Sequence, residues 1–407
     1  MPTDAATPAV SVISDRINAL EAPQTIEMAK KARALAAQGV DVISLSFGEP
    51  DFQTPQYIKD AAKQAIDEGF TFYTPVPGIP QLRQAICDKL KRDNNLDYQP
   101  DSIVVSTGAK QALANAVLAL VNPGDEVIIF SPFWVSYEEM VKLAEGVTVR
   151  LEGALENDYK VTAAQLEAAI TPRTKLVMYS SPCNPTGAVW SRQELADIAA
   201  VLARHPQVLV VADEIYEYIN FVGEHASLAQ FEEVKDQVVT VNGFSKGYAM
   251  TGWRIGYLAA RPDIAAACDK LQSQVTSATC SITQRAALAA LQGGRASADE
   301  MVAAYRRRRD LVLEMVKDIP GFVTPTPEGA FYIFPDVSAY FGKLTPAGDT
   351  ITTSRELALY LLNDAHVAAV DGGAFGAPRC LRFSTAAADD KLIEAFRRIA
   401  LSLAKLH

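Results

Sequence analysis

The sequence predicts an α/β protein with a large domain, built on a mainly parallel sheet flanked by helices, and a smaller α+β domain. Three observations support this prediction. The chain has 407 residues, which is more than a single hydrophobic core usually serves. Between residues 57 and 264, apolar runs of strand length alternate with segments of helical period. After residue 297 this alternation gives way to one long helical pattern followed by separate short strands.

Six apolar runs are expected to form strands of the large domain. They lie at residues 102–106, 126–130, 175–180, 208–212, 238–242 and 255–259. The amphipathic segments between them are expected to form the covering helices. One of these segments, residues 110–121, begins after Thr107, Gly108 and Ala109 and ends before an Asn-Pro-Gly sequence that stops helices.

The smaller domain is expected to combine both ends of the chain. A long helix at 297–317 precedes strands at 331–334, 366–370 and 380–384 and a terminal helix from Asp389. A further helix at 23–38 is expected to pack on this domain. The predicted boundaries are an N-terminal arm at 1–13, a small domain at 14–48 and 296–407, and a large domain at 49–295.

The composition argues against several classes of function. The chain has 38 Lys and Arg against 48 Asp and Glu, a net charge of −10, which speaks against nucleic-acid or anionic-membrane binding. The basic run at 306–309 is expected to be a solvated helix face or an inter-domain contact. The five scattered cysteines are expected to be reduced, mostly buried thiols of a cytoplasmic protein. The first residues predict neither a signal peptide nor a membrane anchor.

Lys246 is the first candidate for chemistry. It lies in a glycine-punctuated, mostly apolar stretch, NGFSKGYAMTGWR, where loss of hydration would lower the pKa of its amine and make it a nucleophile or base. Ser245 and Arg254 could hold a phosphate group beside it. A phosphorylated aldehyde at such a lysine indicates pyridoxal phosphate. The alternative is an ordinary lysine whose apolar stem is buried and whose ammonium reaches water.

Polar residues at the ends of the expected strands are further candidates, because ligands of open α/β sheets sit beyond the carboxyl ends of the strands. Asp213 follows a buried run and would need a cationic partner such as a protonated pyridine nitrogen. It could equally cap the next helix. Tyr216, three residues on, could reach the phenolic oxygen of the ring or simply belong to the core.

Three loops that follow strands complete the candidate site. Asn184 lies between two prolines, which restrict the backbone and would fix its amide; one of these X-Pro bonds is a candidate for the cis form. The loop from Ser106 to Lys110 leads into a helix whose free N–H groups suit a phosphate. Trp134 could lie flat against an aromatic ring. Tight turns and ordinary packing are the alternatives.

In their order along nearly the whole chain, these motifs resemble fold-type I, class I pyridoxal-phosphate aminotransferases, and among these the bacterial aspartate aminotransferases. The matching segments begin with Ser14-Asp15-Arg16, FGEPDF and Tyr73-Thr74-Pro75, continue with STGAKQAL, SPFWVSY, SPCNPTG, ADEIYEYI and the Lys246 motif, and end with Leu381-Arg382-Phe383-Ser384. The resemblance implies a seven-stranded sheet. One departure is Gly108-Ala109 where the family usually has two glycines, which fits if Ala109 keeps an ordinary φ.

The resemblance also implies a role for each matching residue. Lys246 would form the Schiff base and move the proton, Asp213 would hold the pyridine nitrogen, Asn184 and Tyr216 the phenolic oxygen, and Trp134 would stack on the ring. The phosphate would be bound by Ser245, Arg254, Gly108, Ala109, Lys110 and, from the neighbouring subunit of a homodimer, Tyr73. Arg382 would bind the substrate α-carboxylate together with Gly48, Asn184 and Trp134. Lys110 and Ser14 would face the distal carboxylate. No metal is expected.

The expected function is transfer of the amino group of L-aspartate to 2-oxoglutarate by a ping-pong mechanism. Prephenate or aromatic amino acid transamination, or another fold-type I reaction such as a C–S lyase, remain alternatives within the family. A binding protein that keeps the fold without chemistry is an alternative of a different class. It would tend to lose Lys246 or Arg382, and both are present.

Overall fold

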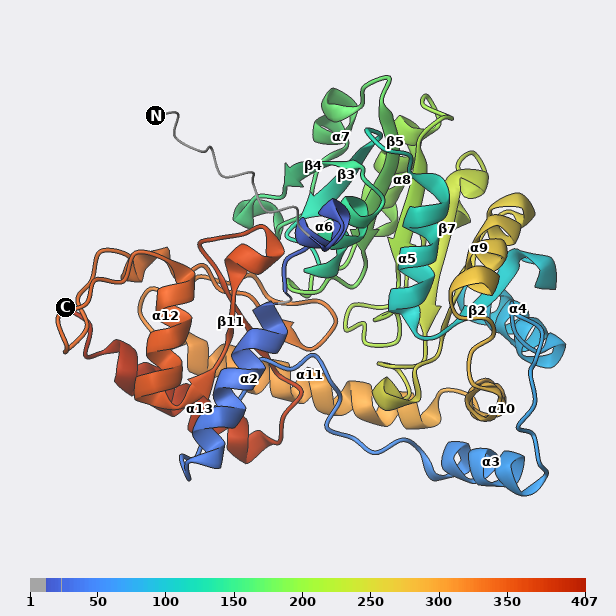
Figure 1. Ribbon diagram of the computed structural model, residues 1–407. Helices are drawn as coiled ribbons and strands as arrows, with labels where there is room; N and C mark the ends of the chain where they lie inside the picture. Colours follow the sequence, from blue (N-terminus) through green and yellow to red (C-terminus); the bar gives the residue numbers. More distant parts are fainter. Residues whose placement is uncertain (1–11, 23) are drawn as a thin grey trace, which may run out of the picture.

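The computed structural model describes residues 12–22 and 24–407, and of residues 24–26 only the backbone. The predicted N-terminal arm at 1–13 therefore lies almost entirely outside the described residues, as does residue 23 at the start of the first predicted helix. Figure 1 shows two regions, one with the large sheet and one with α2, α12 and α13. In the described part of the chain, no helix is long and apolar enough to cross a membrane.

A seven-stranded, mostly parallel sheet forms the larger region, as predicted (Figure 1). Its spatial order is β2-β8-β7-β6-β5-β3-β4, and β8 runs antiparallel to both of its neighbours. The strands are β2 (Ile103–Ser106), β3 (Glu126–Ser131), β4 (Val147–Glu152), β5 (Thr174–Ser180), β6 (Leu209–Asp213), β7 (Val238–Gly243) and β8 (Gly256–Ala259). Six of these agree with the predicted runs to within about two residues, the usual disagreement at element ends.

The strand β4 is not among the predicted runs. It pairs only with β3, at the edge of the sheet, and each of its side chains is half-buried or exposed. Its sequence, VTVRLE, is therefore less apolar than that of the central strands, which are buried on both faces.

Helices cover both faces of this sheet. One face packs on α5 (Ala109–Leu120), α6 (Ser136–Leu143) and α9 (Pro262–Val275). The other face packs on α4 (Pro80–Asn94), α8 (Arg192–Leu202) and α10 (Ser281–Gln292), with α3 (Gln56–Asp67) and α7 (Ala163–Ala169) beside them. Because the central strands are apolar on both sides, each face can bury a separate layer of side chains.

The second region has its own hydrophobic core. Two short strands pair in parallel, β1 (Ile43–Ser44) with β10 (Val367–Ala368), and an antiparallel sheet has the order β11 (Val370–Asp371), β12 (Leu381–Ser384), β9 (Tyr332–Ile333). The helices are α2 (Gln24–Ala37), α11 (Ala296–Lys317), α12 (Ser354–Tyr360) and α13 (Asp389–Leu403). The run at 366–370, predicted as one strand, forms two short strands in two different sheets. Helix α2 contributes Met28 and Ala32 to this core, as predicted.

Single helical turns connect these elements. They are α1 (Asp15–Asn18), η1 (Pro100–Ser102), η2 (Leu155–Asn157), η3 (Leu228–Gln230), η4 (Lys235–Gln237), η5 (Thr251–Trp253), η6 (Ser338–Tyr340), η7 (Leu361–Ala365) and η8 (Gly372–Phe375). The short helix α1 contacts α6 of the larger region.

Helix α11 joins the two regions (Figure 1). The guanidinium of Arg308 donates to both carboxylate oxygens of Asp51, at 2.7 and 2.8 Å. Part of the basic run at 306–309 thus makes a contact between distant segments, one of the two roles predicted for it. The cysteines are free, and all but Cys280 are buried, also as predicted.

Candidate active site

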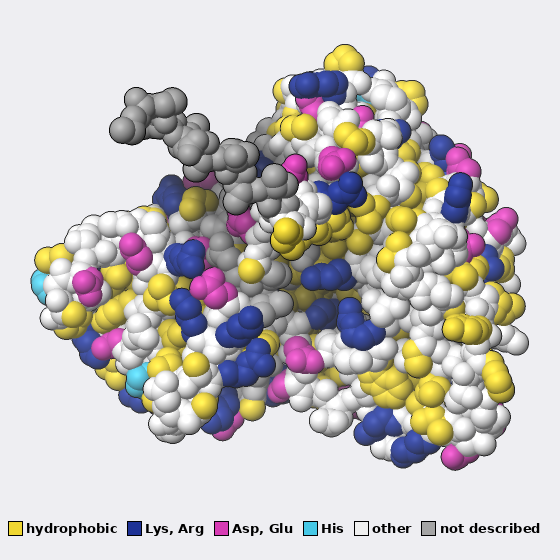
Figure 2. All heavy atoms as spheres, in the orientation of Figure 1, with side chains coloured by type: hydrophobic (Ala, Val, Ile, Leu, Met, Phe, Trp, Pro, Cys, Tyr) yellow, Lys and Arg dark blue, Asp and Glu magenta, His cyan; other side chains and the backbone are white. Residues whose placement is uncertain are grey.

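A cavity of about 380 Å³ lies beyond the carboxyl ends of the parallel strands. Figure 2 shows Lys and Arg side chains gathered in a hollow between the two regions of the chain. The predicted site residues that line the cavity are Gly48, Ala109, Lys110, Trp134, Asn184, Asp213, Tyr216, Ser245, Lys246, Arg254 and Arg382. The structure therefore brings together in one space residues that are up to 334 positions apart, from Gly48 to Arg382.

Lys246 follows β7, and its amine donates a hydrogen bond to the carbonyl oxygen of Gly48. The rings of Tyr216 and Phe331 have their centroids 5.7 and 5.9 Å from the Nζ atom. Burial lowers the pKa of Lys246 to about 8, although Glu49 raises it in part. A larger fraction of the amine is therefore neutral near physiological pH, as the sequence analysis predicts for a nucleophile or base.

Asp213 ends β6 and is buried. The hydroxyl of Tyr137 donates to its Oδ2 atom at 2.7 Å, and the Ile215 N–H donates to Oδ1 at 3.2 Å. Burial raises the pKa of Asp213 to about 6, and Tyr137 opposes this shift. A cation placed against this carboxylate would favour its ionised form.

Tyr137 is a site residue that the sequence analysis did not single out. It lies on α6, one turn after Trp134, and the two rings meet edge to face with centroids 5.8 Å apart. The available signal was the spacing of three residues in SPFWVSY, because a turn in which the Tyr137 N–H donates to the Trp134 carbonyl brings the two side chains together.

Arg382 on β12 is a buried cation, with 2% of its surface exposed. Its Nη1 atom donates to Asn184 Oδ1 at 2.9 Å and its Nη2 atom to the Ser46 carbonyl at 2.7 Å. The Nε atom is buried without a hydrogen-bond partner, and among the described residues no carboxylate pairs with this guanidinium. An incoming carboxylate would supply the missing charge.

The tyrosine pair beside Arg382 was only half predicted. The hydroxyls of Tyr216 and Tyr332 are 2.6 Å apart, and the Arg382 guanidinium lies 4.5 Å from the centre of the Tyr332 ring. A Cβ atom at Gly48 would overlap the Tyr332 hydroxyl, so a larger residue there would have to displace Tyr332. Tyr332 sits in an apolar strand run, FYIF, which gave no sign that its hydroxyl faces a cavity.

The opposite end of the cavity suits an anion. Helix α5 begins at Ala109 after Gly108, so the first N–H groups of the helix have no partner within it. Arg254 lies close by, and a Cβ atom at Gly108 would be 2.5 Å from its Nη2 atom. Ala109 does not have a positive φ. An alanine can therefore replace the second glycine of the family's usual pair without backbone strain. Ser245 is buried at the same cavity.

Lys110 lies over the Trp134 ring, with Nζ 4.8 Å from the ring centre. The surrounding protein and the Arg254 cation lower the pKa of Lys110. No carboxylate among the described residues pairs with Lys110. The cavity therefore has positive side chains at several points on its wall and room for more than one anionic group.

Three predicted residues do not line the cavity of this chain. Gly108 lies behind it and contacts Arg254. Tyr73 is 97% exposed. Ser14 is exposed at the start of α1, which packs on α6.

These residues fit pyridoxal phosphate. The cavity offers an amine of lowered pKa, a buried carboxylate whose raised pKa calls for a cation, and an anion site at a helix start beside Arg254. The Ser180 hydroxyl also lines the cavity and is buried without a partner. Asn184, Tyr216 and Trp134 line the same cavity, and the loop of Asn184 has a cis Ser181-Pro182 bond, as expected for one of its prolines.

The sequence pattern described as "Aminotransferase class I and II" matches residues 40–399. The aspartate/prephenate aminotransferase of Cereibacter sphaeroides is 49% identical over 96% of this chain and 98% of its own length. The aspartate aminotransferase of Bacillus sp. strain YM-2 is 46% identical over 95% and 98%.

Solved structures resemble the fold closely. The aspartate aminotransferase of Rhizobium meliloti superposes with a TM-score of 0.94 at 42% identity, over 97% of this chain and 99% of that one. The Thermus thermophilus aspartate aminotransferase with maleate has a TM-score of 0.90 at 40% identity, over 97% and 100%.

Proposed function

This chain belongs to the class I and II aminotransferase family, and from that premise we propose that it transfers the amino group of L-aspartate to 2-oxoglutarate with pyridoxal phosphate as cofactor. The products would be oxaloacetate and L-glutamate. The observation that supports this most directly is the meeting of Lys246, Asp213 and Arg382 in one cavity. We also propose that the enzyme works in the cytoplasm, where its cysteines would stay free thiols.

When bound, the cofactor supplies an aldehyde that condenses with amines and a ring that withdraws electrons from an adjacent C–H bond. Lys246 would hold the aldehyde carbon and move the proton at the substrate Cα, a task suited to an amine with a pKa of about 8. Asp213, held by Tyr137, would keep the ring nitrogen protonated. Asn184 and Tyr216 would bind the phenolic oxygen, and Trp134 would cover one ring face.

The substrate would be bound by its two carboxylates. Arg382 would take the α-carboxylate, because no carboxylate of the described residues pairs with its guanidinium, and Gly48 leaves the space beside it. Lys110 would face the distal carboxylate, because it lines the same cavity and pairs with no carboxylate of the described residues. A related enzyme has been solved with maleate, which is also a dicarboxylate. Ser14 is exposed and does not line the cavity, so it would reach the distal carboxylate only after the segment that holds it moves.

Three measurements test this function. In a panel of amino donors with 2-oxoglutarate, aspartate should give the highest kcat/KM, and Lys246→Ala should abolish turnover and the cofactor–lysine absorbance. Replacing Lys110 by Ala should lower kcat/KM for aspartate more than for alanine. If Lys110→Ala keeps the wild-type kcat/KM for aspartate and also for alanine, the dicarboxylate assignment is wrong.

Prephenate is a second candidate amino acceptor, because one relative is named an aspartate/prephenate aminotransferase. The same assay with prephenate in place of 2-oxoglutarate decides this point. Release of product without any oxo acid would instead indicate a lyase, and a colourless protein after incubation with the cofactor would indicate a binding protein without this chemistry.

A further inference from the structure

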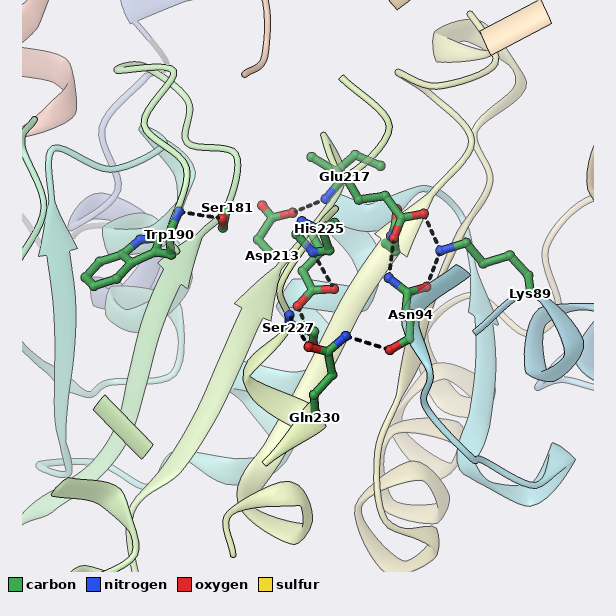
Figure 3. Close-up of polar contacts among 12 residues, drawn as sticks. Lys89, Asn94, Ser181, Trp190, Asp213, Glu217, His225, Ser227 and Gln230 are labelled. Carbon is green, nitrogen blue, oxygen red and sulfur yellow. Dashed lines mark hydrogen bonds and ion pairs between the residues drawn. The ribbon is translucent and has the colours of Figure 1, made fainter. Parts of the chain in front are cut away.

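A cluster of buried charges lies behind Asp213, outside the residues that line the cavity (Figure 3). It contains two carboxylates, Glu214 and Glu217, and two nitrogen bases, Lys89 and His225. The Glu214 side chain is 1% exposed and that of His225 is 7% exposed. Buried charges are costly unless they are balanced, so the protonation state of each member matters.

Lys89 and Glu217 form one half of this cluster. The Lys89 ammonium contacts the Glu217 carboxylate and donates to Asn94 Oδ1 at 2.7 Å, while Asn94 Nδ2 donates to Glu217 at 2.9 Å. Glu214, Glu217 and His225 have ligand atoms within 4.8 Å of one another, which would also suit a metal ion. The Lys89 ammonium, however, already supplies a positive charge to Glu217, and this favours internal charge balance over a metal.

Glu214 and His225 form the other half. The Ser227 hydroxyl donates to Glu214 Oε1 at 2.7 Å, and His225 Nε2 lies 3.1 Å from Glu214 Oε2. His225 Nδ1 has no hydrogen-bond partner among the described residues. The contact with Glu214 is an ion pair only when the His225 ring is protonated. Lys89 supplies one positive charge to this cluster, and the two glutamates supply two negative charges. The cluster of these four residues is therefore neutral only when His225 is protonated.

Glu214 connects this cluster to the cavity. It follows Asp213 directly, so the two carboxylates belong to adjacent residues. Its N–H donates to the Val241 carbonyl at 2.8 Å, which holds this backbone segment beside β7. After burial, the negative charge of Glu214 is a cause of the raised pKa of Asp213. Burial lowers the pKa of His225, but Glu214 and Glu217 outweigh it and the pKa lies above its ordinary value.

We propose that His225 is a positioning residue that is positively charged in the folded protein. It holds Glu214 away from the cavity and cancels the electric field of the Glu214 carboxylate, so that Asp213 stays ionised toward the cofactor ring. This inference rests on the proposed function. Besides Asp213, the titratable groups that act on the pair are Lys89 of α4, Glu217 of the turn after β6, Tyr98 before β2, Tyr179 of β5 and Tyr257 of β8.

The first test concerns the charge alone. The chain has only four histidines, so nitrogen NMR of histidine-labelled protein without cofactor can follow each ring through a pH titration. His225, assigned by its loss in His225→Gln, should remain an imidazolium at pH 7.5. A neutral His225 ring at that pH would overturn the inference whatever the enzyme's activity.

The second test concerns the coupling to the site. In the cofactor-loaded His225→Gln protein, the pKa read from the cofactor–lysine absorbance should rise by about one unit, a tenfold change, because Glu214 is left uncompensated. The matched control is His205→Gln, since His205 also pairs with a glutamate at 3.1 Å, but at the surface; its absorbance pKa should equal that of the wild type. The double variant Glu214→Gln with His225→Gln should return the value to that of the wild type and guards against misfolding of the single variant.

An absorbance pKa in His225→Gln equal to that of the control would overturn the coupling. Failure of the proposed function looks different, because then neither wild type nor variants would give the cofactor absorbance or oxo-acid-dependent turnover.

Discussion

Lys246 and Asp213 are ionisable side chains whose pKa values are shifted toward each other by the same cause. Burial moves the lysine pKa down to about 8 and the aspartate pKa up to about 6. Each shift means that the folded protein disfavours the charged form, so both groups cost stability in the absence of a ligand. A phosphorylated cationic ring would offset the free-energy cost of burying the charged Asp213, and this contributes to cofactor binding.

Replacing Lys246 by Met should stabilise the cofactor-free protein. The folded pKa of about 8 lies below the ordinary value of 10.5, so the penalty for the charged amine is fully present below pH 8 and disappears as pH rises toward 10.5. The variant should gain up to about 3 kcal/mol in free energy of unfolding at pH 7. Urea denaturation at pH 7 and pH 10, at one protein concentration, measures this. A gain that does not shrink at pH 10 would assign the effect to packing and not to the charge.

Replacing Tyr137 by Phe should weaken the hold on the cofactor. The lost hydrogen bond to Asp213 is 2.7 Å long, and without it the pKa of Asp213 should rise further, leaving less carboxylate to face the ring nitrogen. A hydrogen bond to a charged group contributes about 1.5–3 kcal/mol, so cofactor affinity should fall by about tenfold or more. Tyr159→Phe is the control, because its hydroxyl contacts the Phe334 carbonyl away from the cavity. Equal cofactor dissociation constants for the two variants would contradict the role given to Tyr137.

At the scale of elements, the turn before α5 determines where the phosphate site forms. Gly108 has φ of +86°, a conformation that favours glycine, and it brings the start of the helix against Arg254. The short connection from β2 to α5 therefore supplies both the free N–H groups and the space for the guanidinium.

Replacing Gly108 by Ala should damage this site in a way that backbone strain alone does not. Gly124 has nearly the same φ, +85°, but a Cβ atom there would meet nothing within 4 Å. Both Gly→Ala changes should cost about 1 kcal/mol of stability through strain. Only Gly108→Ala displaces Arg254, so only this variant should lose affinity for pyridoxal phosphate, by about tenfold for one weakened charge-assisted contact. Thermal unfolding and cofactor titration of the two variants separate the effects; similar affinities would show that Arg254 tolerates the methyl group.

The elements that sequence could predict are those with a single strong pattern. Strands β5, β6 and β7 are mostly apolar because both of their faces are covered, and α5 has clear start and stop residues. The edge strand β4 was not predicted because it is partly exposed and carries polar residues, so it lacks a continuous apolar run. Tyr137 and Tyr332 were not predicted as site residues, because a tyrosine in an apolar run cannot be told from a core residue by sequence alone. Their hydroxyls pair with residues that are distant in sequence.

At the scale of the whole molecule, the cavity needs both regions of the chain. Lys246 and Asp213 come from the large sheet, whereas Arg382 comes from the small antiparallel sheet and reaches across to Asn184. The pair between Arg308 and Asp51 fixes α11 to the segment that leads from Gly48. The domain limits themselves stay a prediction, although the separate hydrophobic cores support them.

The predicted contribution of Tyr73 to a neighbouring subunit can be tested by mixing two impaired proteins. Tyr73 is 97% exposed and outside the cavity of its own chain, so it can act at a site only if another copy approaches. Lys246→Ala destroys the lysine of one site, and Tyr73→Ala should lower cofactor affinity at the partner's site. When the two variants are unfolded together and refolded, about half of the dimers should be hybrids.

In each hybrid, the chain that keeps Lys246 would receive the intact Tyr73 from its partner, so one of its two sites is complete. Activity at limiting cofactor should therefore rise above that of either variant, toward about a quarter of the wild-type value per chain. If Tyr73 acted within its own chain, the chain with Lys246 would still lack its tyrosine in every hybrid, and mixing would restore nothing. Separate refolding of each variant under the same conditions is the control for gains that come from refolding alone.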